Sequence, residues 1–205
     1  GDGWLAPAEG GYAYLGTVNN ERGMAFGNGV LYLVSRAGGN NIRRLDPMTG
    51  LDLGSPLNVT GISGGTFAVN KVAVGGDGVI YVANLTTASS ASSPFKVYSY
   101  ATEASAPVVA FSGTTTLVGA RIGDSTLAVT GSGSSTRLAS GFGNSPAIAG
   151  NNGYSIIDPT AGTSTEVGFL GTPPNAGDFR LGLTFTDSTH LYGNQGNAAL
   201  RYTSF

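Results

Sequence analysis

A turn followed by a hydrophobic strand occurs twice in nearly the same letters, and this repeat constrains the fold more than any other feature of the sequence. The copies are Asn28–Val34 and Asp77–Ala83, and their turn glycines, Gly29 and Gly78, stand 49 residues apart. Asn-Gly and Asp-Gly accept positive φ at both central positions of a hairpin turn. Repetition at about 40 to 50 residues is typical of propeller blades, so we predict a tandem of small antiparallel sheets.

Two further matches extend the repeat toward the C-terminal part of the sequence. Leu45–Gly50 recurs as Ile157–Gly162, displaced by 112 residues. Tyr192 matches Tyr81 of the second turn-and-strand copy, displaced by 111 residues. Both displacements equal two units of about 56 residues, within the range of propeller repeats. These spacings divide the chain into four units of four strands, which begin near the cations Arg22, Lys71, Arg121 and Arg180.

Short segments with a period of two fill these units, and no window shows the apolar spacing of a helix. Their β-branched and aromatic content suits a pleated, half-buried surface. We predict strands at Val30–Ser35, Val79–Leu85, Phe95–Tyr100, Pro107–Phe111, Thr126–Thr130, Tyr154–Ile157, Leu181–Phe185 and Leu200–Phe205. The predicted fold class is all-β and β-propeller-like, with about four blade-like units of antiparallel four-stranded sheets.

The last unit offers only three strands before the sequence ends. The outer edge of such a sheet exposes unpaired backbone groups that template another strand. The alternating segment Gly11–Val18 is predicted to supply it, either in the same molecule, which closes a ring, or in a neighbour, which makes a polymer. Residues 1–18 are therefore assigned to an N-terminal arm and residues 19–205 to a propeller-like domain. The candidate assembly residues are Trp4, Leu5, Tyr12 and Tyr14, although Trp4 could instead plug one end of its own domain.

Composition excludes several kinds of chemistry. The 205 residues contain no cysteine, a single histidine, 10 Lys and Arg, and 12 Asp and Glu. Disulfides, thiolate zinc sites and thiol nucleophiles are therefore excluded, and no basic tract is present to bind nucleic acid. No apolar stretch approaches the ~20 residues that span a bilayer. His190 lies in an expected strand without the partners of a catalytic triad, so we predict no catalytic residue, no metal and no cofactor.

Seven segments of the chain resemble a known family. They are Asn20–Phe26, Leu33–Gly39, Leu57–Asn70, Tyr81–Thr87, Ser93–Tyr98, Gly119–Asp124 and Asp178–Gly182. The resemblance, which extends over residues 20–205, is to an uncharacterised repeat domain of exported bacterial proteins whose members are propeller-like. It implies an extracellular or cell-surface location, and it brings no activity or catalytic residues.

Four cations at equivalent positions form the strongest candidate binding site. Arg22, Lys71, Arg121 and Arg180 each open the first strand of a unit, and first strands line the central channel of a propeller. A ring of cations could gather an anion such as a uronate or sialate-type sugar. Alternatively, each cation pairs with a local carboxylate where blades meet, as buried cations usually do.

Low charge, the lack of catalytic chemistry and the open last unit favour a non-catalytic extracellular structural or adhesive module that assembles into a fibre through its N-terminal strand. A propeller that binds a glycan or small anion is the alternative, and a polysaccharide-processing enzyme is the third possibility. The expected partners are another copy of the chain and a glycan, and not nucleic acid. Two Asn-x-Thr sequences, at Asn58 and Asn84, are candidate glycosylation positions.

Overall fold

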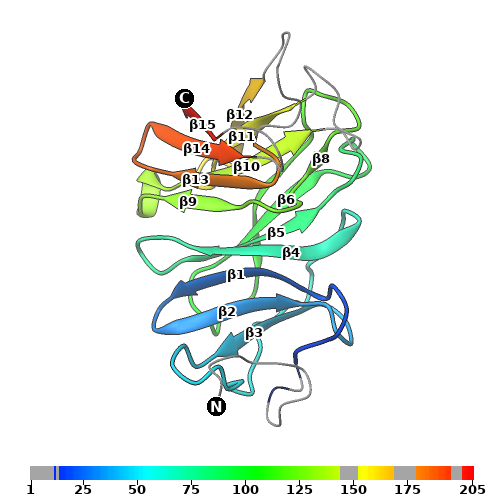
Figure 1. Ribbon diagram of the computed structural model, residues 1–205, viewed down its shortest axis with the longest axis vertical. Helices are drawn as coiled ribbons and strands as arrows, with labels where there is room; N and C mark the ends of the chain where they lie inside the picture. The colour runs from blue at the N-terminus through cyan, green and yellow to red at the C-terminus, as the bar shows by residue number, and fades with distance from the viewer. Residues whose placement is uncertain (1–11, 13, 144–151, 169–178, 195–199) are drawn as a thin grey trace.

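The chain folds into four antiparallel sheets, and Figure 1 shows the first sheet at one end of the long axis, the second in the middle, and the third and last sheets together at the other end. This computed structural model describes residues 12, 14–143, 152–168, 179–194 and 200–205. Within these ranges the single helical element is a 3-10 turn at Gly133–Ser135, so the all-β prediction is confirmed. The described residues include no helix of the length and hydrophobicity that a membrane crossing requires.

Each sheet is built from strands that are consecutive in the sequence. The first sheet contains β1 (Glu21–Gly27), β2 (Val30–Ser35) and β3 (Asn41–Leu45). The second contains β4 (Phe67–Val74), β5 (Ile80–Leu85), β6 (Phe95–Tyr100) and β7 (Val108–Gly113). The third contains β8 (Arg121–Ile122), β9 (Ala128–Thr130), β10 (Arg137–Gly143), β11 (Asn152–Asp158) and β12 (Thr163–Gly168). The last contains β13 (Gly182–Phe185), β14 (His190–Asn194) and β15 (Arg201–Ser204).

The prediction of four strands in every sheet is met only by the second sheet, since the others have three, five and three strands. In the first sheet, an irregular segment takes the fourth position along β3, where Leu53 N–H donates to Arg44 O and Leu57 N–H donates to Ile42 O. In the third sheet, β8 and β9 both pair with β10 and share one position, because the chain between them leaves the ladder.

The first strands of neighbouring sheets lie against each other, which positions the candidate site. Gly23 of β1 lies so close to β4 that an added Cβ would be 2.5 Å from Lys71 Cα, and a Cβ on Gly27 would meet Val74. Glycine is therefore required for this close approach of two backbones. Between the second and third sheets, Gly76 N–H donates to Gly131 O.

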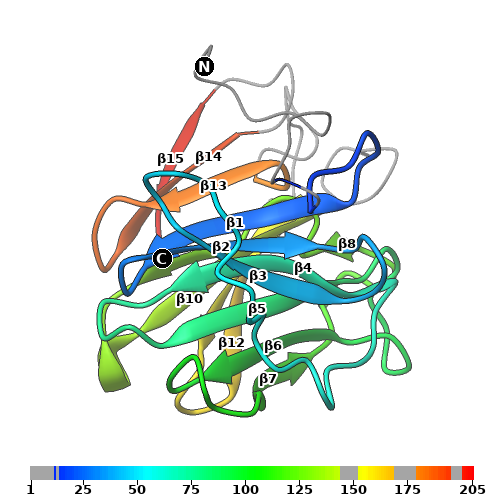
Figure 2. The ribbon, with the colours of Figure 1, turned by 90° about the horizontal axis from the view of Figure 1, so that it is seen from below.

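Three hydrophobic clusters fill the spaces between successive sheets. Alternate residues of a strand point to opposite faces, so an inner sheet contributes to two clusters at once. Within β5, Ile80 and Val82 pack toward the first sheet, whereas Tyr81 and Ala83 pack toward the third. The third cluster joins Tyr154 and its neighbours in the third sheet to the last sheet. Figure 2 shows the last sheet on the side of the molecule opposite to β6 and β7.

The described part of the predicted N-terminal strand is not a strand. The ring of Tyr14 is buried against Leu33 and Leu45 of the first sheet, and its hydroxyl donates to Gly50 O. The hydroxyl of Tyr12 donates to Thr49 O at 3.1 Å. In the same molecule these residues cover the first sheet and do not complete the last one, so this part of the prediction is wrong. The physical reason is apolar burial, since the ring of Tyr14 is only 4% exposed where it packs on these leucines.

Candidate functional site

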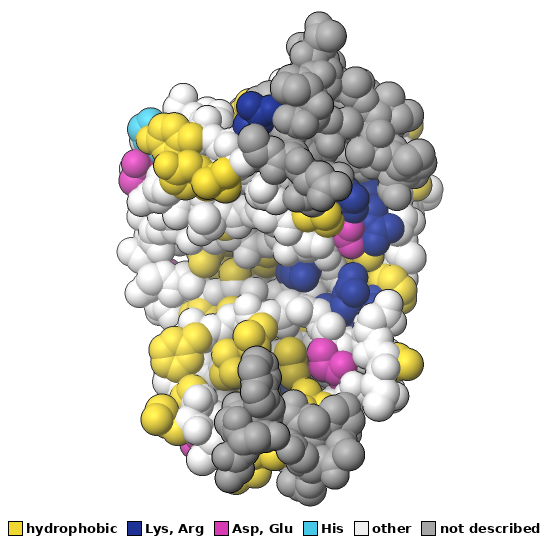
Figure 3. All heavy atoms as spheres, viewed as in Figure 1, with side chains coloured by type: hydrophobic (Ala, Val, Ile, Leu, Met, Phe, Trp, Pro, Cys, Tyr) yellow, Lys and Arg dark blue, Asp and Glu magenta, His cyan; other side chains and the backbone are white. Residues whose placement is uncertain are grey.

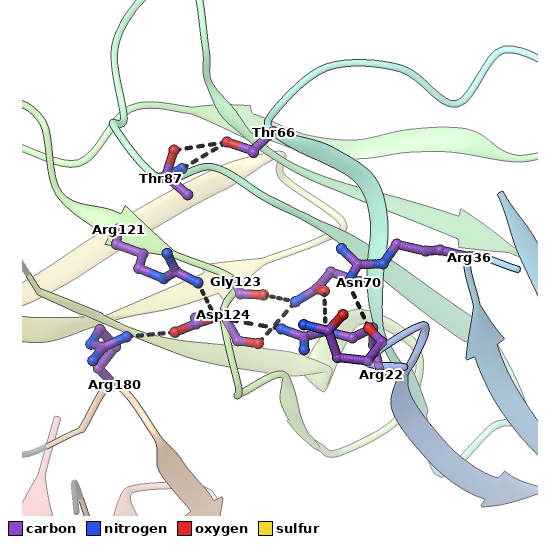
Figure 4. A network of polar contacts seen from close by, with 10 residues as sticks. Arg22, Arg36, Thr66, Asn70, Thr87, Arg121, Gly123, Asp124 and Arg180 are labelled. Carbon is purple, nitrogen blue, oxygen red and sulfur yellow. Dashed lines mark hydrogen bonds and ion pairs between the residues drawn. The ribbon is translucent and has the colours of Figure 1, made fainter. Parts of the chain in front are cut away.

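Three of the four cations predicted from the sequence converge on one carboxylate (Figure 4). The side chain of Asp124 accepts a hydrogen bond from Arg121 Nη2 at 2.7 Å and another from Arg180 Nη1 at 2.5 Å. Arg22 Nη2 lies 3.8 Å from Asp124 Oδ1. Arg22 belongs to the first sheet and Arg121 to the third, and Arg180 lies two residues before β13 of the last sheet. One carboxylate therefore links three sheets.

Asp124 reaches this position because it lies in the interruption between β8 and β9. Gly123, directly before it, has φ of 77°, a conformation that other residues rarely adopt. The buried side chain of Asn70, from the second sheet, donates to the carbonyl oxygens of Gly123 and Asp124. Asn70 Oδ1 also accepts a hydrogen bond from Arg22 Nε at 3.2 Å. All four sheets therefore meet at this polar network.

The carboxyl group of Asp124 stays ionised at neutral pH. Burial raises its pKa, but the hydrogen bond and positive charge of Arg121 and the charges of Arg180 and Arg22 outweigh burial, so the net pKa lies below the usual value. A charged carboxylate holds guanidinium groups through short charge-assisted hydrogen bonds. Of the two alternatives for the cations, pairing with a carboxylate therefore holds for these three arginines, although the carboxylate is shared and not local to each.

Lys71 belongs to the same region but differs from the arginines. It forms no ion pair in the part of the chain that the structure describes. Burial lowers the pKa of its ammonium group, the charge of Arg22 and then that of Arg36 lower it further, and the charge of Asp124 opposes them. The predicted group of four cations is thus brought together, with the fourth member left without a counter-ion among the described residues.

Arg36 is a further cation of this region that the sequence reasoning missed. Its guanidinium carbon lies 3.6 Å from the centre of the Phe67 ring, and its Nη2 donates to Asn19 O at 3.0 Å. Burial and the charge of Arg22 lower its pKa. The signal that could have revealed Arg36 is strand register, because Ser35 pairs with Glu21 and so places the next residue beside the start of β1.

A pocket of about 450 Å³ opens beside this network. Figure 3, in the same view as Figure 1, shows several Lys and Arg side chains close together on one side of the molecule. Five cations lie in this region, and among the described residues Asp124 is the one carboxylate that forms ion pairs with any of them, so positive charge is in local excess although the whole chain has a formal charge of −2. Such an excess attracts anions and raises their local concentration. The residues that line the pocket are Asn19, Asn20, Arg22, Arg36, Gly39, Asn40, Phe67 and Arg121.

Residues 11–170 match the family model described as "Domain of unknown function (DUF4623)". The chain belongs to this family. Its structure is similar to the crystal structure, at 1.91 Å resolution, of a DUF4623 family protein from Bacteroides eggerthii DSM 20697, with a TM-score of 0.67 and 20% sequence identity. The similarity covers 90% of this chain and 43% of the other, so the DUF4623 domain described here spans less than half of that relative.

A second similar structure is the PQQ-bound form of an aldose sugar dehydrogenase from Streptomyces coelicolor, with a TM-score of 0.49 and 18% identity over 86% of this chain and 56% of that one. No curated protein matches the sequence. The family match confirms the resemblance to an uncharacterised domain that the sequence motifs indicated, and DUF4623 as a family carries no assigned activity.

The two candidate glycosylation positions of this DUF4623 domain differ in burial. Asn58 is exposed. Asn84 is fully buried, where its amide donates to Pro94 O and its oxygen accepts the N–H of Lys96. A side chain that is buried and hydrogen-bonded on both sides cannot accept a glycan in the folded chain, so the structure corrects this assignment. Asn84 holds β5 to the start of β6.

The single histidine does not take part in the basic site. His190 lies on the last sheet, with Nδ1 3.0 Å from Asp187 Oδ2 and its ring stacked on that of Tyr202. Within the described ranges, no group of three or more His, Cys, Asp and Glu residues is arranged to hold a metal ion. Trp4 and Leu5, two of the four candidate assembly residues, lie outside the described residues.

Proposed function

We propose that this domain is a non-catalytic, extracellular binding module whose basic pocket holds an acidic saccharide, and that its four sheets are the blades of a propeller-like arc. The single observation that carries the proposal is the excess of cations around the pocket. Three guanidinium groups line it, from Arg22, Arg36 and Arg121, and Asp124, the carboxylate that pairs with two of them, is shared with Arg180 as well. A ligand with a carboxylate would offset the repulsion among these groups.

The chemistry of the lining residues favours an acidic sugar over a bare anion. Guanidinium groups bind carboxylates in a planar, two-pronged geometry. The amide side chains of Asn19, Asn20 and Asn40 supply donors and acceptors that suit hydroxyl groups. Pockets of roughly 300 to 1,000 Å³ hold small ligands, and about 450 Å³ suits a ligand of one or two sugar residues.

Burial of Arg36 adds a reason for a ligand. Its Nε and Nη1 are buried and have no hydrogen-bond partner among the described residues. Burying unpaired charged groups is costly, and the lowered pKa of Arg36 follows from this burial and from the charge of Arg22. A bound anion would stabilise the charged form of Arg36 and of its neighbours, so binding should raise the thermal stability of the domain.

The test is a titration of the isotopically labelled domain, followed by NMR, with oligogalacturonate and with the neutral galactose oligomer of the same length. We expect the acidic sugar to bind and to shift signals around the pocket, and the neutral sugar to bind at least tenfold more weakly. Arg36→Gln should weaken binding of the acidic sugar at least tenfold. Arg43→Gln is the matched control, because Arg43 pairs with Asp52 away from the pocket.

Two outcomes of this titration would contradict the proposal. One is equal binding of the acidic and neutral oligomers, and the other is equal loss of binding in the two arginine variants. The fibre-forming role through the N-terminal strand stays a prediction from the sequence, as does the third possibility, a polysaccharide-processing enzyme. Trp4 and Leu5, two of the candidate assembly residues of that fibre, lie outside the described residues.

A further inference from the structure

The cations of the basic pocket differ in their counter-ions. Arg36 and Arg121 both line the pocket, and Figure 4 shows them on opposite sides of Asn70. Arg121 Nη2 donates to the carboxylate of Asp124 at 2.7 Å. Arg36 forms no ion pair with a carboxylate of the described residues. One end of the pocket therefore has a neutralised cation, and the other end has a cation without a counter-ion in the described part of the chain.

The carboxylate of Asp124 lies among guanidinium groups as the acid group of a ligand would. One of its oxygen atoms accepts the hydrogen bond of Arg121 and lies 3.8 Å from Arg22, and the other accepts the hydrogen bond of Arg180. The side chain of Asp124 is only 8% exposed. A ligand carboxylate would bind these arginines through the same kind of charge-assisted hydrogen bond. Asp124 therefore already uses the binding capacity that an acid group of a ligand would need at this end of the pocket.

The backbone between β8 and β9 keeps this carboxylate in place. Asn70 donates to the carbonyl oxygens of Gly123 and Asp124. A Cβ on Gly123 would collide with Asn84 O, so this stretch of backbone is closely packed. To reach Arg121, a ligand carboxylate would have to displace Asp124, which exchanges one ion pair for another with little net gain. Because its pKa lies below the usual value, Asp124 is ionised at neutral pH, and in its place it repels a ligand anion.

Arg36, by contrast, can bind an acid group without losing an ion pair. Its guanidinium carbon lies 3.6 Å from the centre of the Phe67 ring, and its Nη2 donates to Asn19 O. Its Nε and Nη1 have no hydrogen-bond partner among the described residues. Gly39 N–H donates to Arg36 O, so Gly39 and the adjacent Asn40, which also line the pocket, belong to this end. An amide side chain has donors and an acceptor for sugar hydroxyl groups, so this end suits one carboxylate and the hydroxyl groups next to it.

We propose that Asp124 acts as a charge selector, which restricts the basic pocket to saccharides with a single acid group. The inference rests on the anion binding proposed above and narrows its ligand class. The carboxylate of such a sugar binds at the Arg36 end, and the neutral part of the sugar faces Asp124 and Arg121. A second carboxylate in the ligand meets a cation whose charge Asp124 has already offset, so it adds little to the affinity. The ligand is then a saccharide that fits the pocket of about 450 Å³ and carries one carboxylate.

Two disaccharides of the same shape test the selector. Digalacturonate carries two carboxylates, and galacturonosyl-galactose carries one, with a hydroxymethyl group in place of the other. We expect their dissociation constants for the wild-type domain, measured by calorimetric titration at pH 7, to agree within about threefold. Asp124→Asn keeps the shape of the side chain and removes its charge, so Arg121 becomes available and digalacturonate should bind at least tenfold more tightly than the single-acid sugar. Asp52→Asn is the matched control, because it breaks the ion pair with Arg43 away from the pocket and should leave the ratio of the two constants unchanged.

The ratio of the two dissociation constants separates selection from a merely structural role. A structural role of Asp124 lowers the stability of the variant but leaves the ratio as it is in the wild type, and that result would overturn the proposal. A wild-type domain that binds digalacturonate at least tenfold more tightly than the single-acid sugar would overturn it as well. This comparison needs no variant, so it decides the question even where circular dichroism shows that Asp124→Asn is unfolded. If neither acidic sugar binds more tightly than neutral digalactose, the proposed function itself fails, whereas a wrong ratio between two acidic sugars that both bind overturns the selector alone.

Discussion

Two tyrosines at equivalent positions of the repeat, Tyr81 in β5 and Tyr192 in β14, have different surroundings. Tyr81 is 5% exposed and packs into the cluster between the second and third sheets. Tyr192 is 36% exposed and lies on the outward face of the last sheet. The local pattern is the same in both strands, so burial is decided by whether another sheet follows. The comparison shows that a sheet of this fold is stabilised mainly by its neighbours.

The largest expected effect follows from removing the buried ring of Tyr81. Tyr81→Ala should lower the free energy of unfolding by about 3 to 5 kcal/mol, because a large aromatic side chain is removed from a packed core and a cavity remains. Tyr192→Ala should cost less than about 1 kcal/mol, because its ring keeps much of its contact with water. Urea-induced unfolding of both variants measures the difference. Similar losses would contradict the explanation by neighbouring sheets.

Removing the carboxylate of Asp124 tests whether the sheets also stabilise one another through their shared ion pairs. Asp124→Asn should cost about 2 to 4 kcal/mol at neutral pH, since breaking a buried pair costs about 3 to 5 kcal/mol and the partner arginines keep some contact with solvent. The network spans the first, third and last sheets. The loss should therefore exceed that of Tyr192→Ala, which is confined to the last sheet.

The same variant should change how stability depends on pH. The pKa of Asp124 is lower in the folded than in the unfolded chain, so its contribution is present above the unfolded pKa, near 3.9, and is lost as pH falls through the folded pKa. The difference in the free energy of unfolding between the wild type and Asp124→Asn should therefore shrink between pH 7 and pH 2. A constant difference over this range would show that Asp124 acts through shape and not through charge.

Local features of the fold could be predicted from the sequence. The alternation of Val30–Ser35 and Phe95–Tyr100 gave the bounds of β2 and β6 without error. The repeated segments Leu45–Gly50 and Ile157–Gly162 each contain Asp-Pro, a common start of a turn. This feature is equally local, since Asp46 Oδ1 accepts the N–H groups of Met48 and Thr49. Such features depend on residues that are close along the chain, and a single segment contains the information.

Features that depend on contacts between sheets could not be predicted. The sequence placed Arg22, Arg121 and Arg180 at equivalent positions, but it did not indicate that they share one partner, Asp124. The interruption between β8 and β9 that carries Asp124 is set by packing against Asn70 of another sheet. The position of Tyr14 on the first sheet was missed for a similar reason, because an alternating segment gives no sign of which sheet it covers.

Close packing between β1 and β4 is tested by a smaller substitution. Gly23→Ala should cost about 1 to 3 kcal/mol, because the added methyl group would lie 2.5 Å from Lys71 Cα and the two backbones must separate. Gly168→Ala, at the end of β12, is the matched control, since an added Cβ there meets nothing within 4 Å. Thermal unfolding compares the two variants. An equal effect would show that β1 and β4 are not held at this separation.

The smallest expected effect is a shift in the titration of Lys71, which lies in β4 near the arginines of the basic pocket. The chain has two lysines, so Lys96→Arg leaves Lys71 as the one lysine to be labelled by reductive ¹³C methylation. Its amine should titrate at a lower pH in the folded chain than in the same chain in urea, because burial and the charges of Arg22 and Arg36 disfavour the ammonium form. Adding Arg36→Gln should move the folded value part of the way back. Equal titration of the folded and unfolded chains would mean that Lys71 is neither desolvated nor close to the arginines. Lys71 would then not contribute to the positive charge near the pocket.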